Sequence, residues 1–349
     1  MKIIQKEILN SEYILQKENT LFGKWIHYQH ISPVLKKLSH QLDVTCIGSS
    51  ENNLPINSVS FGVGSKKILI WTQMHGNEST GTKALFDFFN CIVNSDVAVF
   101  KTILKECTIL CIPMLNPDGS FNYTRVNQRG VDLNRDAVDR KAKESKLLRS
   151  ILEEFDPHFC FNMHDQRTIF GVEGTENPAS ISFLAPSEEE TRKLTNGRTQ
   201  TMNVIVSMNK LLQEVIPNHI GRYTDEFYPS ATGDNFQKLG YNTILIEAGH
   251  FPDDYDREEV RKFNFFALVQ GVFHIATAKN YEDYQAYFDI PNNQKNFFDV
   301  IKTDVNTGIS KGYLYVDSVK DSVLCADISL EKEGDLSGYL AHSSEFLKE

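Results

Sequence analysis

Short apolar runs alternate with longer amphipathic segments along most of the chain. The run KKILIWTQ at 66–73 is almost continuously apolar, as expected of a strand that is buried on both faces. Further runs of strand length lie at 44–50, 57–64, 107–114, 159–163 and 242–249. The pattern therefore predicts a series of short, mostly buried strands.

Helical patterns stand between these runs. Apolar residues recur at helical spacing from Ala84 to Val93, directly after a run of strand length. The segments 142–155, 187–215 and 257–278 show similar periodicity and are predicted to be helical. Alternation of strands and helices predicts an α/β fold with a mixed, mostly parallel central sheet flanked by helices. Ligands in such folds bind beyond the carboxyl ends of the strands.

The pattern changes near both ends of the chain. Residues 1–43 are polar and weakly periodic, which predicts an N-terminal helical extension packed on a main domain at 44–286. After Ile290 and Pro291 the chain turns to short strands, FFDVIKT, GYLYVDS and SVLCADISL. We therefore expect a small C-terminal β module at 287–349.

Composition excludes several classes of partner. The formal net charge is -10, which argues against nucleic acid and against an anionic membrane surface. No apolar stretch reaches the length of a membrane span, and the N-terminus lacks the apolar core of a secretory signal. Six scattered cysteines without a CxxC pair suit reduced thiols. We expect a cytoplasmic protein, and the oligomeric state is left open.

Candidate metal ligands lie where two predicted strands end. His75 and Glu78 are three residues apart at a strand-to-helix turn, and His164 ends the buried run FCFNMH. A zinc ion that catalyses hydrolysis needs three protein ligands and one open position. The same His-x-x-Glu spacing recurs at His342 and Glu345, but in a polar C-terminal tail with no buried strand before it. Context, not spacing, therefore selects the first pair.

An ordered set of motifs makes the pattern specific. HGNE at 75–78 is followed by NPDG at 116–119, a lone Arg125, GVDLNR at 130–135, and then His164 and Glu247 at strand ends. This order, over roughly residues 44–280, resembles the M14 (carboxypeptidase A-like) family of zinc carboxypeptidases. The resemblance implies a metallocarboxypeptidase that hydrolyses the C-terminal amide bond of a peptide, with one Zn²⁺ per chain and 44–286 as its catalytic domain.

The resemblance also implies a role for each matching residue. The zinc ligands are His75, Glu78 and His164, the general base is Glu247, the oxyanion is stabilised by Arg125, and substrate is bound by Asn134, Arg135 and Tyr228. These roles agree with the chemistry of the groups. A carboxylate can take a proton from water, and a guanidinium can grip a terminal carboxylate with two hydrogen bonds.

Two other functions stay open. Deacylases similar to aspartoacylase and succinylglutamate desuccinylase share the HGNE and DLNR motifs and act on small N-acyl amino acids. NPDG and the loop around Tyr228 favour the peptidase. A catalytically inactive zinc-binding protein is the third reading. The expected substrate is a peptide or a small N-acyl compound with a free carboxylate.

Four further residues carry hypotheses. Asn162 stands where many family members have Asp, which alters any support for a ligand histidine. Asp136 follows the substrate-binding pair and is expected to hold Arg135 or to attract a cationic group. Asp234 is expected to favour a basic C-terminal residue or the free amine of a diaminopimelate peptide. His250, just after the base, either lines the cleft or is an ordinary turn histidine.

Overall fold

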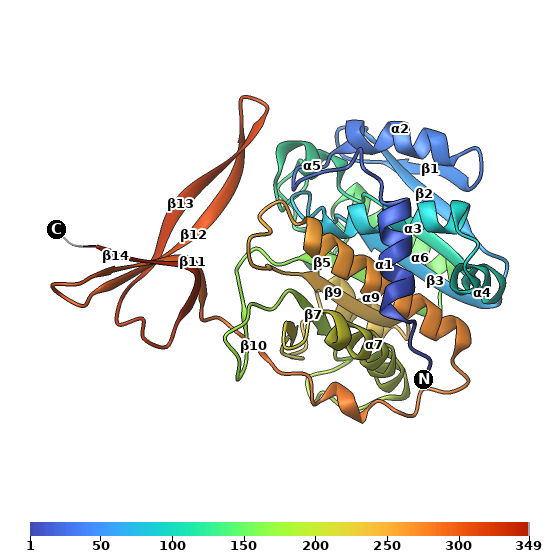
Figure 1. Ribbon diagram of the computed structural model, residues 1–349. Coiled ribbons are helices and arrows are strands. Elements are labelled where there is room, and N and C mark those ends of the chain that lie inside the picture. The colour runs from blue at the N-terminus through green and yellow to red at the C-terminus, as the bar shows by residue number, and fades with distance from the viewer. Residues whose placement is uncertain (348–349) are drawn as a thin grey trace.

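A computed structural model describes residues 1–347, and its centre is an eight-stranded mixed sheet (Figure 1). The strands are β1 (Asp43–Ser49), β2 (Pro55–Phe61), β3 (Lys66–Thr72), β4 (Cys107–Ile112), β5 (Phe159–Asp165), β7 (Ile181–Leu184), β8 (Ile220–Arg222) and β9 (Asn242–Ala248). Their order in space is β1-β2-β4-β3-β5-β9-β7-β8. The central strands β4, β3, β5 and β9 are parallel, so their carboxyl ends meet at one edge. The predicted α/β class is confirmed.

Helices cover both faces of this sheet. They are α1 (Lys6–Gln16), α2 (Tyr28–Leu38), α3 (Thr80–Asn94), α4 (Ala98–Glu106), α5 (Pro117–Asn122), α6 (Lys143–Phe155), α7 (Asn196–Val215), α8 (Thr232–Lys238) and α9 (Glu258–Thr277), with short 3-10 turns η1 (Leu133–Arg135) and η2 (Gln285–Tyr287). Successive strand residues point to opposite faces. Ile68 and Ile70 of β3 therefore join the core under α3 and α9, while Leu69 and Trp71 join the core under α6 and α8.

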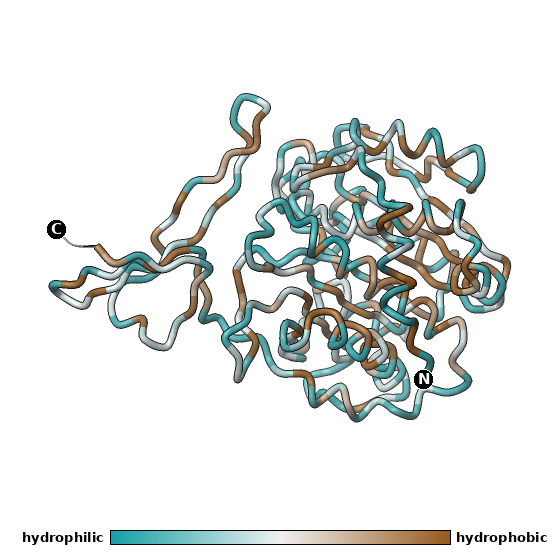
Figure 2. The backbone as a smooth tube through the Cα atoms, viewed as in Figure 1, coloured by the Kyte–Doolittle hydropathy of each residue, from teal (hydrophilic) through white to brown (hydrophobic). Residues whose placement is uncertain are grey.

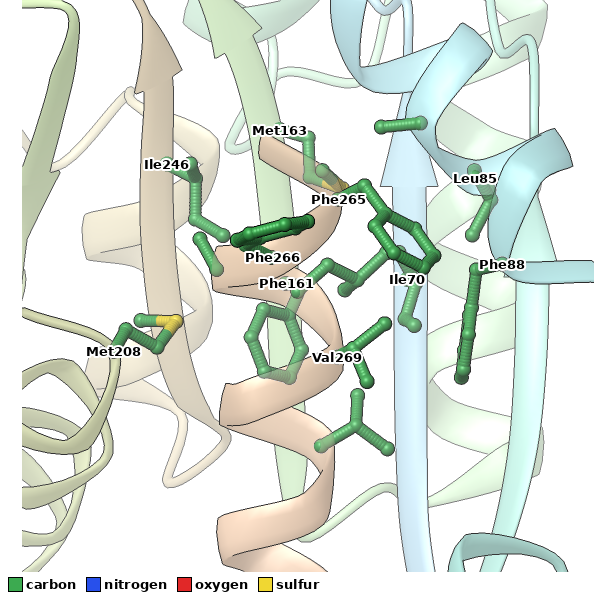
Figure 3. Packing of buried hydrophobic residues seen from close by; sticks show 14 of the residues in the cluster. Ile70, Leu85, Phe88, Phe161, Met163, Met208, Ile246, Phe265, Phe266 and Val269 are labelled. Carbon is green, nitrogen blue, oxygen red and sulfur yellow. The ribbon is translucent and has the colours of Figure 1, made fainter. Parts of the chain in front are cut away.

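The larger core explains the apolar runs in the sequence. Figure 3 shows Phe265, Phe266 and Val269 of α9 packed against Phe161 of β5 and Ile70 of β3. The tube in Figure 2 is brown along these central segments and teal on the outer loops. Strands buried on both faces need apolar side chains at nearly every position. This rigid core holds the strand ends that carry the candidate ligands.

The C-terminal β module is a separate four-stranded sheet, drawn in red in Figure 1. Its strands are β11 (Phe297–Asp304), β12 (Ser310–Lys320), β13 (Val323–Gly334) and β14 (Leu340–Leu347), in the order β13-β12-β11-β14. A short strand β10 (Asn293–Gln294) pairs with β6 (Gly171–Val172) of the main body. Residues 348–349, the last two of the predicted module at 287–349, lie outside the described residues.

Two local predictions were wrong. Residues 187–195 were expected to be helical, but the helix begins only at Asn196, where the Thr195 hydroxyl accepts the Arg198 backbone N–H. The acidic run before this helix is not helical, and the Glu188 carboxylate accepts a hydrogen bond from the Thr195 hydroxyl. The segment around His342 was expected to be a polar tail but forms β14, because it pairs in parallel with β11. Within residues 1–347, no helix has the length and apolarity to cross a membrane.

Candidate metal and substrate site

The side chains of His75, Glu78 and His164, called the triad below, converge in the interior. They are 1%, 2% and 2% exposed. His75 Nδ1 lies 2.8 Å from Glu78 Oε1, His164 Nδ1 lies 2.8 Å from Glu78 Oε2, and the two Nδ1 atoms are 3.1 Å apart. Ligand atoms about 2.0–2.1 Å from a tetrahedral zinc lie roughly 3.3 Å from one another. The spacing of the triad therefore fits a zinc ion at its centre.

Local backbone geometry presents the first two ligands. After β3 the chain bends at Gln73, which has φ 50° and is anchored through its amide to the Ile26 and Gly76 carbonyls. The next turn packs against the backbone of α5. A Cβ on Gly76 would lie 1.9 Å from the carbonyl carbon of Gly119, so only glycine fits there. The HGNE and NPDG motifs are therefore two halves of one packed contact.

Asn116 completes that contact. Its side-chain oxygen accepts the Gly119 backbone N–H at 2.9 Å, which caps α5. Its amide nitrogen donates to the Met74 carbonyl at 3.1 Å, one residue before the ligand His75. NPDG thus supports the metal loop from outside the triad.

Asp132 is a functional residue that the sequence analysis missed. His75 Nε2 lies 3.0 Å from Asp132 Oδ1, so the ring donates there and keeps a lone pair on Nδ1 for a metal. Burial would raise the pKa of Asp132, but its contacts with His75 and Arg125 outweigh burial and hold that pKa far below the usual value. Asp132 lies in GVDLNR, between residues already singled out. Metal-ligating histidines commonly donate their second N–H to a carboxylate, and this rule could have directed attention to Asp132.

Arg125 lies beside the triad and is 42% exposed. Its Nε donates to Asp132 Oδ2 at 2.9 Å, and its Nη1 is 3.5 Å from Glu78 Oε1. The guanidinium is therefore fixed at one end by Asp132, and its Nη1 lies beside Glu78 of the triad. A donor held in this way can stabilise negative charge that develops on a substrate oxygen.

A pocket of about 200 Å³ adjoins the triad and collects most of the other predicted residues. Its lining includes Asn134, Arg135, Tyr228, Asp234 and Glu247. Asn134 Oδ1 accepts the backbone N–H at the start of α8, which fixes the amide in the wall. Within residues 1–347 the Arg135 guanidinium forms no ion pair, and it donates only to the neighbouring carbonyl of Asn134. The pocket thus holds a guanidinium free to receive a carboxylate.

Glu247 lies opposite His164 across the paired strands β5 and β9. Burial and the charges of Glu78 and Asp165 raise its pKa well above the usual value, and Arg125 opposes this. A carboxylate with a raised pKa next to a metal triad has the character of a general base.

The remaining hypotheses have mixed outcomes. Tyr228 lines the pocket but is 50% exposed, and its hydroxyl donates to Glu226. Asp136 neither holds Arg135 nor faces the pocket, because it is buried and accepts the backbone N–H groups of Lys141 and Ala142. Asn162 also lines the pocket, and within residues 1–347 its side-chain oxygen has no hydrogen-bond partner, so it does not support a ligand histidine by a hydrogen bond from that atom.

A family model identifies the chain. The zinc carboxypeptidase (peptidase M14) model matches residues 27–243, more than half of the sequence, so the chain belongs to that family. The match includes the triad, Arg125, Asn134 and Arg135, and it ends before Glu247.

Relatives and solved structures agree with this assignment. A probable carboxypeptidase 2 of Trichophyton verrucosum is 28% identical over 200 residues, which cover 55% of this chain and 36% of that protein. The chain therefore spans about a third of that relative's length. Carboxypeptidase A from Helicoverpa armigera has a similar fold, with a TM-score of 0.58, 16% identity, and coverage of 78% of this chain and 81% of that one. A Pseudomonas aeruginosa metallo-carboxypeptidase in complex with (2-guanidinoethylmercapto)succinic acid matches at a TM-score of 0.56 and 14% identity, covering 71% and 69%.

Proposed function

We propose that this chain is a zinc-dependent carboxypeptidase that removes the C-terminal residue of a peptide. One observation carries the proposal: the triad adjoins a pocket that holds both an unpaired guanidinium, Arg135, and a buried carboxylate, Glu247. The first can bind a terminal carboxylate, and the second can manage a proton at the scissile bond. A deacylase of N-acyl amino acids would use the same groups, so substrate choice decides between the two functions.

Each residue then has a defined task. A zinc ion held by His75, Glu78 and His164 would supply a Lewis acid that polarises the scissile carbonyl and makes water more acidic. Glu247 takes a proton from the attacking water and passes it to the leaving nitrogen. Arg125 donates to the oxyanion, which is worth about 3–4 kcal/mol in comparable sites. Asn134 and Arg135 hold the terminal carboxylate and thereby set the register of the substrate.

Asp234 supports a preference for a basic terminal residue. It is 5% exposed and lines the pocket, and among the described residues the Tyr228 backbone N–H is the one group of another residue that donates to it. Burial raises its pKa to about 6. A lysine or arginine side chain entering the pocket would pair with this carboxylate and lower its pKa again.

Two matched substrate sets test the function. The first compares N-blocked dipeptides ending in Arg, Leu or Glu with the same peptides ending in a carboxamide. We expect release of the terminal residue from the free acids, fastest for Arg, and none from the carboxamides. The second set measures acyl release from N-acetyl amino acids. Equal cleavage of the carboxamides would contradict the carboxylate grip, and acyl release alone would establish the deacylase.

An inhibitor gives an independent check. (2-Guanidinoethylmercapto)succinic acid carries a guanidinium and carboxylates, and it is the ligand of the Pseudomonas aeruginosa structure. We expect it to inhibit the wild type and to lose potency in Asp234→Asn. Unchanged potency would show that Asp234 does not read the basic group.

A further inference from the structure

A second group of two histidines and one carboxylate lies where the β module meets the main body. His250 follows β9, Asp299 lies on β11 and His342 lies on β14, and one potential ligand atom of each lies within 4.8 Å of the others. We call these three residues the junction cluster. Among residues 1–347, the triad and the junction cluster are the two groups with this geometry.

Strand pairing brings two of the three side chains together. β11 and β14 are parallel, with Phe298 opposite Ala341 and Val300 opposite Ser343. Asp299 and His342 therefore occupy the same level on adjacent strands. The ring of His250 approaches from the other side of the junction, 6.2 Å between centroids from the ring of His342. The cluster thus spans two separate sheets.

The carboxylate of the cluster is fixed by donors from both sides. Asp299 is 3% exposed, and it accepts the Tyr255 hydroxyl at 3.1 Å and the Tyr315 backbone N–H at 2.7 Å. An ionised carboxylate has about four lone-pair positions, so further positions are left for a cation. Within the described part of the chain, no hydrogen bond reaches either ring nitrogen of His342, which leaves an imidazole lone pair available as well.

His250 already has a hydrogen-bond partner that would compete with an ion. Arg257 Nη2 donates to His250 Nε2 at 2.8 Å, so an ion that binds this nitrogen must displace the guanidinium. Arg257 Nη1 has a separate backbone acceptor, the Ala248 carbonyl at 2.9 Å, whereas Nη2, the nitrogen that must move, also donates to the Gln166 carbonyl at 2.7 Å. The exchange makes binding weaker than at the triad, where, within residues 1–347, the Arg125 guanidinium reaches only the Glu78 carboxylate, at 3.5 Å, and no ligand nitrogen.

Space for an ion is present beside two of these three ligands, His250 and Asp299. A polar cavity of about 40 Å³ is lined by His250 and Asp299 and also by Asp165, Asp254 and Asp317. Lys24, Arg167 and Arg257 complete its charged lining, so the carboxylates outnumber the cations by one. A buried water needs about 10–15 Å³ of such space, so the cavity can hold an ion with one or two water ligands.

We propose that His250, Asp299 and His342 bind a second divalent transition-metal ion, with Zn²⁺ as the probe, and that this ion fastens the β module to the main body. Two imidazoles and one carboxylate suit zinc, and water can complete the tetrahedron. The role is structural, because its ligands come from both sides of the junction. The site therefore differs from the triad in both place and purpose.

Zinc content tests the proposal directly. The full-length protein is dialysed against a buffer of fixed free zinc, and metal per chain is measured by mass spectrometry. We expect two zinc ions in the wild type, one in His342→Asn, and two in the control His40→Asn, which changes an exposed histidine elsewhere. His342→Asn should keep its hydrolytic activity. One zinc in both the wild type and His342→Asn overturns the proposal.

A second measurement needs no variant. Graded chelation of the wild type should release zinc in two steps, the weaker junction ion first. A protease should then begin to cut the connection at 288–296 after the first step, before any change at the triad. Release of a single equivalent, or no gain in proteolysis after the first step, would also overturn the proposal.

Discussion

The triad and the junction cluster use the same donor types but differ in how the surrounding chain prepares them. In the triad the two Nδ1 atoms face each other at 3.1 Å, and Asp132 orients the His75 ring from behind. In the junction cluster, Arg257 Nη2 donates to His250 Nε2 at 2.8 Å, so a guanidinium is already bound to a nitrogen that an ion would need. A carboxylate behind a histidine raises its basicity toward a metal, whereas a cation in front of it competes. The residue that hydrogen-bonds to the ligand histidine, more than the type of ligand, therefore determines which of the two sites binds zinc more tightly.

Removing the base should have the largest effect and should separate metal binding from chemistry. Glu247→Gln keeps the shape of the side chain but cannot accept the proton, so kcat/KM should fall by about 10²–10⁴-fold. Zinc content should stay at the wild-type value, because Glu247 is not a ligand. Peptide hydrolysis and metal per chain are measured on the same preparation. Full activity would remove Glu247 from the mechanism, and loss of zinc would make it part of the metal site.

The two clusters also show what the sequence could and could not predict. His75 and Glu78 are three residues apart in the turn that follows a clear apolar run, so a short sequence pattern is enough to identify both. Asp132 is one aspartate among many until the fold places its Oδ1 3.0 Å from His75 Nε2. The junction cluster has no local spacing at all, because β14 acquires its partner only through pairing with β11. Long-range pairing leaves no periodic trace in the strand itself.

For secondary structure too, elements with a clear local pattern could be predicted from the sequence, and elements without one could not. The strand at 66–73 was visible because it is buried on both faces, and it is β3. The short strands β7 and β8, with four and three residues, carry too few positions for a pattern. The helix at 257–278 was found as α9, whereas the acidic run at 187–195 was wrongly included in α7.

Changing the residue behind the ligand tests the ranking of the two sites. Asp132→Asn weakens the hydrogen bond that orients His75, and zinc affinity at the triad should fall about 10–100-fold. The matched change Asp299→Asn should leave triad affinity and activity as they are and remove the junction ion. Zinc affinity is measured by competition with a chromophoric chelator. Equal effects of the two variants on activity would break the distinction between the sites.

Asp234 is a third kind of buried carboxylate: within residues 1–347 it forms no ion pair, and the charges of Arg135 and Arg198 only partly offset the effect of burial on its pKa. Its pKa is raised to about 6, so it becomes protonated as the pH falls through that value. A cationic substrate needs the ionised form, so the ratio of kcat/KM for Arg-ending over Leu-ending peptides should fall about tenfold per pH unit below pH 6. The ratio cancels effects of pH on zinc and Glu247. Asp234→Asn should give a low ratio that does not vary with pH.

If the Asp234→Asn variant showed the same pH dependence of this ratio as the wild type, the titration would belong to another group. If the wild-type ratio is itself constant between about pH 5 and about pH 8, the pocket does not select basic residues through Asp234. The proposed peptidase function would survive either result, because the proposed grip on the terminal carboxylate uses Arg135 and Asn134 and not Asp234.

The smallest expected effect concerns an ion pair across the junction. Lys24 Nζ lies 2.6 Å from Asp317 Oδ2 on β12, and both side chains are partly exposed. Such pairs contribute about 0.2–1 kcal/mol, so Lys24→Gln alone should lower the melting temperature only slightly. If an ion at the junction cluster carries most of the attachment, the same change in a His342→Asn background should increase proteolysis at 288–296 more than it does in the wild type. A purely additive result would show that the two ties act independently and that the ion is not the main fastening.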